Sequence, residues 1–284
     1  PELCSDEAAN KVERASFALS EYLEGVLKGK VASSVALFPQ YRDVLELIGV
    51  ERVHPADLWP IAWRWINMTL PVQVPPLSYD QASRASLDRS ILKVVQTGDP
   101  EAAGTMRDIS LGFAAAQTEL EASSFWKICA AYFETLALGL GPVDVYGKRA
   151  ASRVLFQYRT LAKGDQAVSD RLAQDLLFFC AQANPSDAKK APILGAVRAA
   201  YGLSESTAVN YESPQFGRYD PAVLVQARKR IAAAQKARWA KQKAAAATRE
   251  DVEDEEEEDG VAPAKGKGKT GFSGGGDVPG GYGW

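Results

Sequence analysis

The clearest element in this sequence is the segment Phe125-Trp126-Lys127-Ile128-Cys129-Ala130-Ala131-Tyr132-Phe133-Glu134-Thr135-Leu136. Phe125, Ile128, Cys129, Tyr132 and Leu136 recur every three or four positions, the spacing that places side chains on one face of an α-helix. The run Gly139-Leu140-Gly141-Pro142 ends the pattern, because glycine and proline both interrupt helices. The segment therefore predicts a deeply buried helix.

The same spacing recurs on both sides of this segment. Further stripes of apolar residues lie at 19–27, 41–48, 87–95, 102–113, 150–161, 172–183, 194–201 and 224–231. Most of them stop at a glycine or at Asn184-Pro185, and two begin at an Asp-Pro pair, Asp99-Pro100 and Asp220-Pro221, which is typical of an N-cap followed by a first-turn proline. No alternating strand of useful length is present. The sequence predicts an all-α fold, a multi-helix bundle with at least seven helices.

The segment 55–76 interrupts the helical pattern. It carries Trp59, Trp63 and Trp65 among five prolines, so it predicts a short helix followed by an extended segment. We interpret the tryptophans as buried anchors of this transition, and an aromatic binding surface is the alternative interpretation.

The composition is that of a soluble globular protein, with 46% hydrophobic and 24% charged residues. No apolar run reaches the length of a membrane helix, and the start lacks a signal-peptide pattern. Cys4, Cys129 and Cys180 lack the CxxC spacing of zinc or redox sites. These features predict a cytoplasmic protein without disulfides, metal or cofactor. Because Pro1 stands first instead of methionine, we expect a fragment or a processed form.

The C-terminal part has a strong charge asymmetry. Residues 228–243 are rich in Lys and Arg, residues 250–259 contain nine carboxylates, and residues 260–284 are rich in Gly and Lys. The acidic run and the Gly-rich end have too few apolar residues to form a core, so the tail 249–284 is expected to be disordered. The basic stretch could bind nucleic acid, but the acidic run can neutralise it, and we expect no nucleic-acid partner.

His54 is the only histidine in the chain. A single histidine cannot form a His-rich metal site, and His54 is the one candidate for imidazole chemistry at neutral pH. Pro55 follows it directly, and proline does not occupy a helix interior, so His54 is expected at a helix boundary. This position favours a capping or packing role for the side chain.

Several long blocks resemble a known signalling family. They are residues 37–59, Leu111-Gly112-Phe113-Ala114, Lys148-Arg149-Ala150-Ala151-Ser152-Arg153-Val154-Leu155, residues 168–180, and Gln215-Phe216-Gly217-Arg218-Tyr219-Asp220-Pro221. Over about residues 12–240 the chain resembles the N-terminal helical region of the hybrid histidine kinases of type IV pilus chemosensory systems, the ChpA or PilL type. The same region is similar to the second domain of the pilus scaffold protein FimL.

The resemblance implies a place in a phosphorelay. Phosphotransfer domains of this family carry an exposed helical histidine with Lys three residues later and Gly after that. Here Asp57 and Leu58 occupy those positions, so we expect no catalytic residue, and His54 as phosphoacceptor is the disfavoured alternative. The parent protein would be a protein-histidine kinase.

The function implied is a non-catalytic scaffold or spacer in the phosphorelay that controls type IV pili and twitching motility. Its partners would be proteins of the pilus chemosensory system, with homo-oligomers formed through the parent kinase. A helical-repeat adaptor that binds a protein in a groove is the alternative from another class. The expected parts are the last helix of a phosphotransfer-like bundle (1–30), a main helical domain (31–211), a basic connector helix (212–248) and the tail (249–284).

Overall fold

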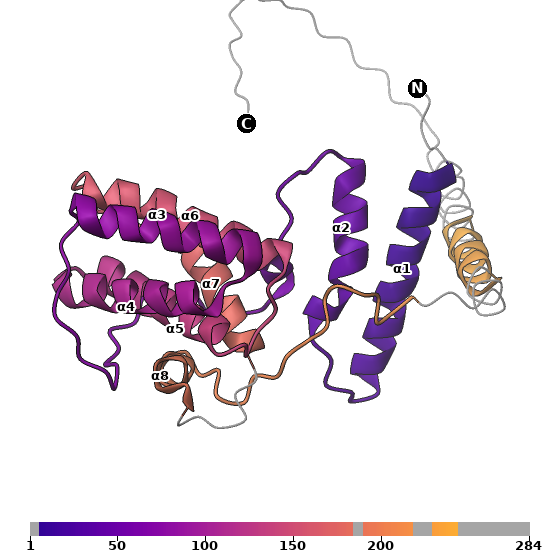
Figure 1. Cartoon of the computed structure of the whole chain (residues 1–284). Helices are drawn as coiled ribbons and strands as arrows, with labels where there is room; N and C mark the ends of the chain where they lie inside the picture. The colour runs from indigo at the N-terminus through magenta and orange to yellow at the C-terminus, as the bar shows by residue number, and fades with distance from the viewer. Residues whose placement is uncertain (1–5, 184–189, 218–228, 244–284) are drawn as a thin grey trace, which may run out of the picture. The chain divides into compact units, whose positions relative to one another are not determined.

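A computed structural model describes residues 6–183, 190–217 and 229–243, and the chain divides into two compact units, 1–220 and 221–284. The described part of the first unit is helical and has no strand, which confirms the all-α prediction (Figure 1). Its elements are α1 (Asp6–Leu27), the 3₁₀ turn η1 (Ser34–Leu37), α2 (Phe38–Leu47), the 3₁₀ turn η2 (Pro55–Leu58), α3 (Gln81–Thr97), α4 (Pro100–Ala116), α5 (Leu120–Ala137), α6 (Val145–Ala162), α7 (Asp170–Gln182) and α8 (Pro192–Ala200).

The helix ends follow the local sequence. The side chains of Asp80, Asp99, Asp144 and Ser169 accept hydrogen bonds from the first free backbone amides of α3, α4, α6 and α7. The predicted glycine stops have the left-handed backbone that ends a helix, as at Gly98, where φ is 68°.

Helix α5 lies at the centre of the core. It packs against α4, α7 and α8, and the five residues of its predicted apolar face are all buried. Helices α3 and α6 lie side by side and α4 runs beside α5 (Figure 1). Because α3 packs on α6 although α4 and α5 separate them in the chain, this packing differs from a stack of repeats, in which each unit touches only its neighbours.

The chain between η2 and α3 crosses α4 and α5 without regular structure, as the sequence predicts. Three hydrogen bonds hold it: the Ser124 hydroxyl donates to the Ile66 carbonyl (2.8 Å), the Lys127 ammonium to the Met68 carbonyl (2.7 Å), and the Leu77 amide to the Gly112 carbonyl (2.9 Å). Each bond satisfies a backbone group that has no partner in a helix or sheet.

The tryptophans of this segment pack against the core but are only partly buried. The Trp59 ring lies edge-on to Phe178, with centroids 5.7 Å apart, and the Trp63 ring stacks on Tyr201. The prediction of buried anchors is therefore wrong in degree: the three side chains contact the core as expected, but each stays partly exposed.

Two buried charged side chains fix α8. The Arg198 guanidinium, 5% exposed, donates to the carbonyls of Cys180 (3.1 Å) and Ser206 (2.7 Å) and also to that of Ala183. The Glu134 carboxylate accepts from the Leu194 amide (2.7 Å) at the start of α8. Arg198 thereby caps the end of α7, whose last carbonyls have no partner within the helix.

Helix α1 begins well before the first residue of its predicted stripe, and that stripe faces solvent. Leu19, Leu23 and Val26 are 48%, 49% and 45% exposed, and Ala18 is the residue of α1 that is buried. The helix packs on α2, and its Glu21 carboxylate accepts from the Gly217 amide (2.9 Å). That α1 closes a phosphotransfer-like bundle stays a prediction.

In the second unit, the described residues 229–243 form a helix with exposed side chains. The stop at Asn184-Pro185, the start at Asp220-Pro221, Cys4 and the tail 249–284 lie outside the described residues. Cys129 and Cys180 are fully buried. Among the described helices, none is both long and apolar enough to cross a lipid bilayer.

The contact between α4 and the irregular segment leads to a paired prediction. A Cβ atom at Gly112 would lie 2.5 Å from Leu77 Cγ, whereas one at Gly104 of the same helix meets nothing within 4 Å. Alanine favours a helix over glycine by about 1 kcal/mol, but overpacking costs roughly 1–3 kcal/mol. We expect Gly104→Ala to stabilise the fold and Gly112→Ala to destabilise it by up to about 2 kcal/mol. Urea unfolding measures both, and equal stabilisation by the two variants would contradict the packing described.

Candidate functional site

His54 is the N-cap of the 3₁₀ turn η2. Its Nδ1 accepts a hydrogen bond from the Ala56 amide (3.1 Å), and its own amide donates to Asp57 Oδ2 (2.9 Å). The two bonds form a reciprocal capping box, here with an imidazole in the place of the usual hydroxyl. Pro55 occupies the first position of the turn, where its missing N–H costs nothing. The imidazole is thus positioned at a helix boundary and used as a cap.

The His54 ring lies in an aromatic pocket. It meets Tyr146, Phe178 and Phe179 edge to face, with ring centroids 5.7, 5.8 and 5.5 Å away. Burial, and secondarily the positive charges of Arg171, Arg153 and Arg149, lower the pKa of His54 from 6.5 to about 3. The ring is therefore neutral at physiological pH.

The neutral ring exists in one tautomer. Because Nδ1 accepts the Ala56 amide proton, the ring proton is on Nε2. Nε2 is buried and has no hydrogen-bond partner among the described residues. Neither ring nitrogen is therefore open to solvent chemistry: one is occupied by the cap and the other is enclosed.

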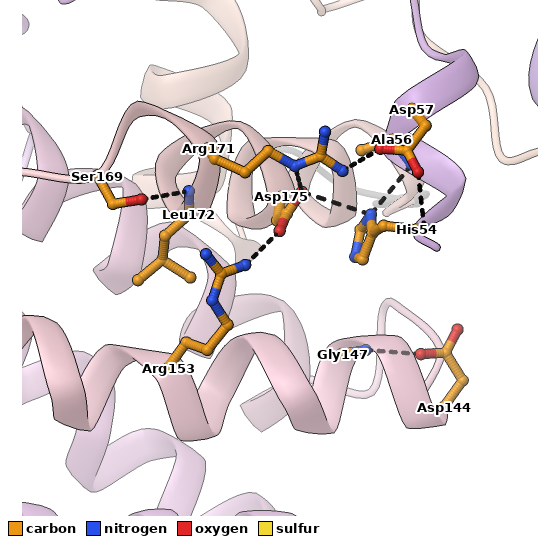
Figure 2. Close-up of polar contacts among 10 residues, drawn as sticks. All are labelled: His54, Ala56, Asp57, Asp144, Gly147, Arg153, Ser169, Arg171, Leu172 and Asp175. Carbon is orange, nitrogen blue, oxygen red and sulfur yellow. Dashed lines mark hydrogen bonds and ion pairs between the residues drawn. The ribbon is translucent and has the colours of Figure 1, made fainter. Parts of the chain in front are cut away.

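Asp175 of α7 is the centre of a charged cluster beside His54 (Figure 2). Its side chain is 3% exposed, and its two oxygens accept from Arg153 of α6 (2.8 Å) and from Arg171 (2.9 Å), which lies one turn earlier on α7. Burial raises the pKa of Asp175, and the two guanidinium groups oppose that shift. Both oxygens accept hydrogen bonds from charged donors, which favour the ionised form of the carboxylate.

Arg171 connects the cluster to the cap. Its second donor reaches Asp57, the residue that completes the capping box of η2 (Figure 2). Asp175 Oδ1 also lies 3.5 Å from His54 Nδ1. That contact is not an ion pair, because the neutral Nδ1 is itself an acceptor. The cluster thus joins α6, α7 and η2 through two carboxylates and two guanidinium groups.

A cavity of about 800 Å³ opens beside this cluster. Its lining includes the buried residues Val53, Tyr146 and Ala150. Five cationic and three acidic side chains line it, an excess of two positive charges. They come from α6, α7, η2 and the chain before η2: Arg52, Lys148, Arg149, Arg153, Arg171, Glu51, Asp57 and Asp175. We refer to this surface as the cationic groove.

Sequence reasoning singled out His54 and its boundary position but missed the residues that converge on it. Arg153, Arg171 and Asp175 are far from His54 in the chain, and the fold brings them together. One local signal was available. Arg171 and Asp175 have the i, i+4 spacing of a helical ion pair, and Asp175 lies among the apolar residues of α7.

The family model of the FimL scaffold protein second domain matches residues 73–214. The chain belongs to this family. The match confirms the FimL resemblance; the resemblance to the pilus hybrid kinases stays a prediction. No curated protein and no solved structure matched the chain. The FimL second-domain region supplies Arg153, Arg171 and Asp175, whereas His54 and Asp57 precede it.

The lowered pKa of His54 predicts a specific pH dependence of stability. The unfolded chain binds a proton at His54 below pH 6.5, but the folded chain does so only near pH 3, so stability falls as the pH drops through this window. Between pH 7 and pH 5 the single imidazole should cost about 2 kcal/mol. His54→Asn keeps a capping acceptor and does not titrate. Between pH 7 and pH 5 its free energy of unfolding should therefore fall by about 2 kcal/mol less than that of the wild type.

Urea unfolding of both proteins at the two pH values measures this difference. Asp57, Asp175 and the three arginines facing the ring are present in both proteins, so their contributions largely cancel in the comparison. Equal losses in the wild type and in His54→Asn would show that the imidazole titrates normally in the folded state.

Proposed function

We propose that this chain is a non-catalytic scaffold segment of a pilus chemosensory pathway, acting through protein partners in the control of type IV pili and twitching motility. Its membership in the FimL second-domain family supports the scaffold role. The pathway and the motility it controls rest on the resemblance of the sequence blocks to the pilus signalling proteins.

The state of His54 is the observation that carries the non-catalytic part of this proposal. A phosphoacceptor imidazole must present a ring nitrogen to the incoming phosphoryl group and act as a nucleophile. Here Nδ1 binds the Ala56 amide and Nε2 is enclosed. Asp57 stands at the position of the family's lysine and is bound by Arg171 and the His54 amide, so the lysine that would stabilise a phosphoryl group is missing.

The competing function is an active phosphotransfer domain that uses His54. It requires the cap to open and the ring to leave the pocket formed by Tyr146, Phe178 and Phe179. That movement would break both hydrogen bonds of the capping box, so it has a structural cost that an exposed helical histidine does not have.

A phosphotransfer assay separates the two functions. The chain is incubated with a receiver domain phosphorylated on aspartate, and acid-labile, base-stable phosphate is measured on the wild type and on His54→Asn. We expect no transfer to either protein. Transfer to the wild type that disappears in His54→Asn, with unchanged unfolding at pH 7, would refute the proposal.

The scaffold role is tested in the bacterium that carries the gene. Deletion of the chain's coding segment should reduce twitching motility, and His54→Asn at its natural expression level should retain it. Asn is the matched control because it caps a helix as well as any residue and cannot carry phosphohistidine. Loss of motility in His54→Asn at normal protein level would contradict the account.

A further inference from the structure

Some charged side chains of the cationic groove form no ion pair with other described residues. Within the cluster, Asp175 is bound by Arg153 and Arg171, and Asp57 is bound by Arg171 and the His54 amide. Arg52, Lys148 and Arg149 line the same cavity, and none of them has an ion-pair partner among residues 6–183, 190–217 and 229–243. Of the three acidic residues that line the groove, Glu51 is the one outside this charged cluster.

The three free cations line the cavity together with buried residues. Lys148 and Arg149 belong to the first turns of α6, which also contain Tyr146 and Ala150, 8% and 2% exposed. Arg52 belongs to a different segment, the chain before η2, and precedes Val53, which is 8% exposed. A ligand in this cavity therefore meets both apolar side chains and positive charge.

We propose that the cationic groove is the docking site for an acidic, partly apolar peptide segment of a protein partner. Carboxylates of the segment pair with Lys148, Arg149 and Arg52, and an apolar side chain of the segment contacts the apolar lining residues. The charge excess of the groove provides the complementarity. This inference rests on the proposed scaffold function and adds the chemistry of the partner.

The size and the composition of the groove favour a peptide over a free anion. A cavity of about 800 Å³ is far larger than one phosphate or carboxylate, and the side chains of Val53, Val145 and Ala150 in its lining offer no hydrogen bond to an anion. Arginine and aromatic residues are enriched in protein interfaces. The acidic run at 250–259 of this chain is the alternative occupant, but it contains a single apolar residue, Val252, to contact these apolar side chains.

A direct binding measurement tests the proposal on the full chain. The probe is a fluorescein-labelled peptide, Asp-Glu-Phe-Asp-Glu-Leu, and its uncharged match is Asn-Gln-Phe-Asn-Gln-Leu. Fluorescence anisotropy should show saturable binding of the acidic probe that weakens with added salt, and at least tenfold weaker binding of the uncharged match. Absence of binding by the acidic probe would overturn the proposal.

Matched charge variants locate the binding. Lys148→Gln with Arg149→Gln removes two charges from the groove, and Lys236→Gln with Arg238→Gln removes two from the exposed helix at 229–243. We expect the groove variant to lose about tenfold in affinity and the helix variant less than twofold, with unfolding curves like that of the wild type. The reverse order would place the binding on the helix and refute the groove.

Two further measurements exclude simpler explanations. Arg52 lines the same groove but lies outside α6. Arg52→Gln should weaken binding of the probe about threefold, so it tests the same site if the α6 variant fails to fold. Complete displacement of the probe by inorganic phosphate at physiological salt, or tighter binding by a peptide of residues 249–260, would overturn the peptide-partner assignment. If the probe does not bind the groove and no phosphate is transferred to His54, the scaffold function still stands and its partner binds elsewhere.

Discussion

The buried carboxylate of Asp175 is the constraint around which this part of the molecule is arranged. A charge that is 3% exposed is stable only if opposite charges and hydrogen bonds replace its hydration. Arg153 supplies one such group from α6 and Arg171 another from α7, so the carboxylate fixes the spacing of the two helices. Arg171 then also binds Asp57, and Asp57 completes the cap at His54. The position of the only imidazole therefore follows from the need to neutralise a carboxylate 121 residues later in the chain.

Much of the helical architecture could be predicted from the sequence because its signals are local. Apolar spacing, Asp and Ser caps and glycine stops act within a few residues, and α3, α4, α6 and α7 each begin at such a cap. The prediction was weaker where tertiary contacts determine whether a side chain is buried. The apolar stripe of α1 was recognisable, but that it faces solvent depends on what lies beside it. The partial burial of Trp59 likewise depends on Phe178, far away in the sequence.

In the candidate site too, some features follow from local sequence signals and others depend on tertiary contacts. That His54 lies at a helix boundary follows from Pro55 and is a local property. That its pKa falls to about 3 depends on three rings and three arginines that come from α6 and α7. The i, i+4 pair of Arg171 and Asp175 could have been read from the sequence, but its contact with the chain before α3 could not. The family match begins at residue 73, so the groove combines helices of the FimL second-domain region with a segment that precedes it.

The central claim is that His54 is a neutral structural cap and not a reactive imidazole. Because the chain has one histidine, nitrogen-15 NMR of the full protein gives a single pair of ring signals that can be followed from pH 8 to pH 3.5. The account predicts the tautomer with the proton on Nε2, an unprotonated Nδ1 that accepts a hydrogen bond, and no midpoint above about pH 4, in line with a pKa of about 3. A ring that titrates near pH 6.5, or a mixture of tautomers that exchange rapidly, would mean that the imidazole is open to solvent, and would contradict the account.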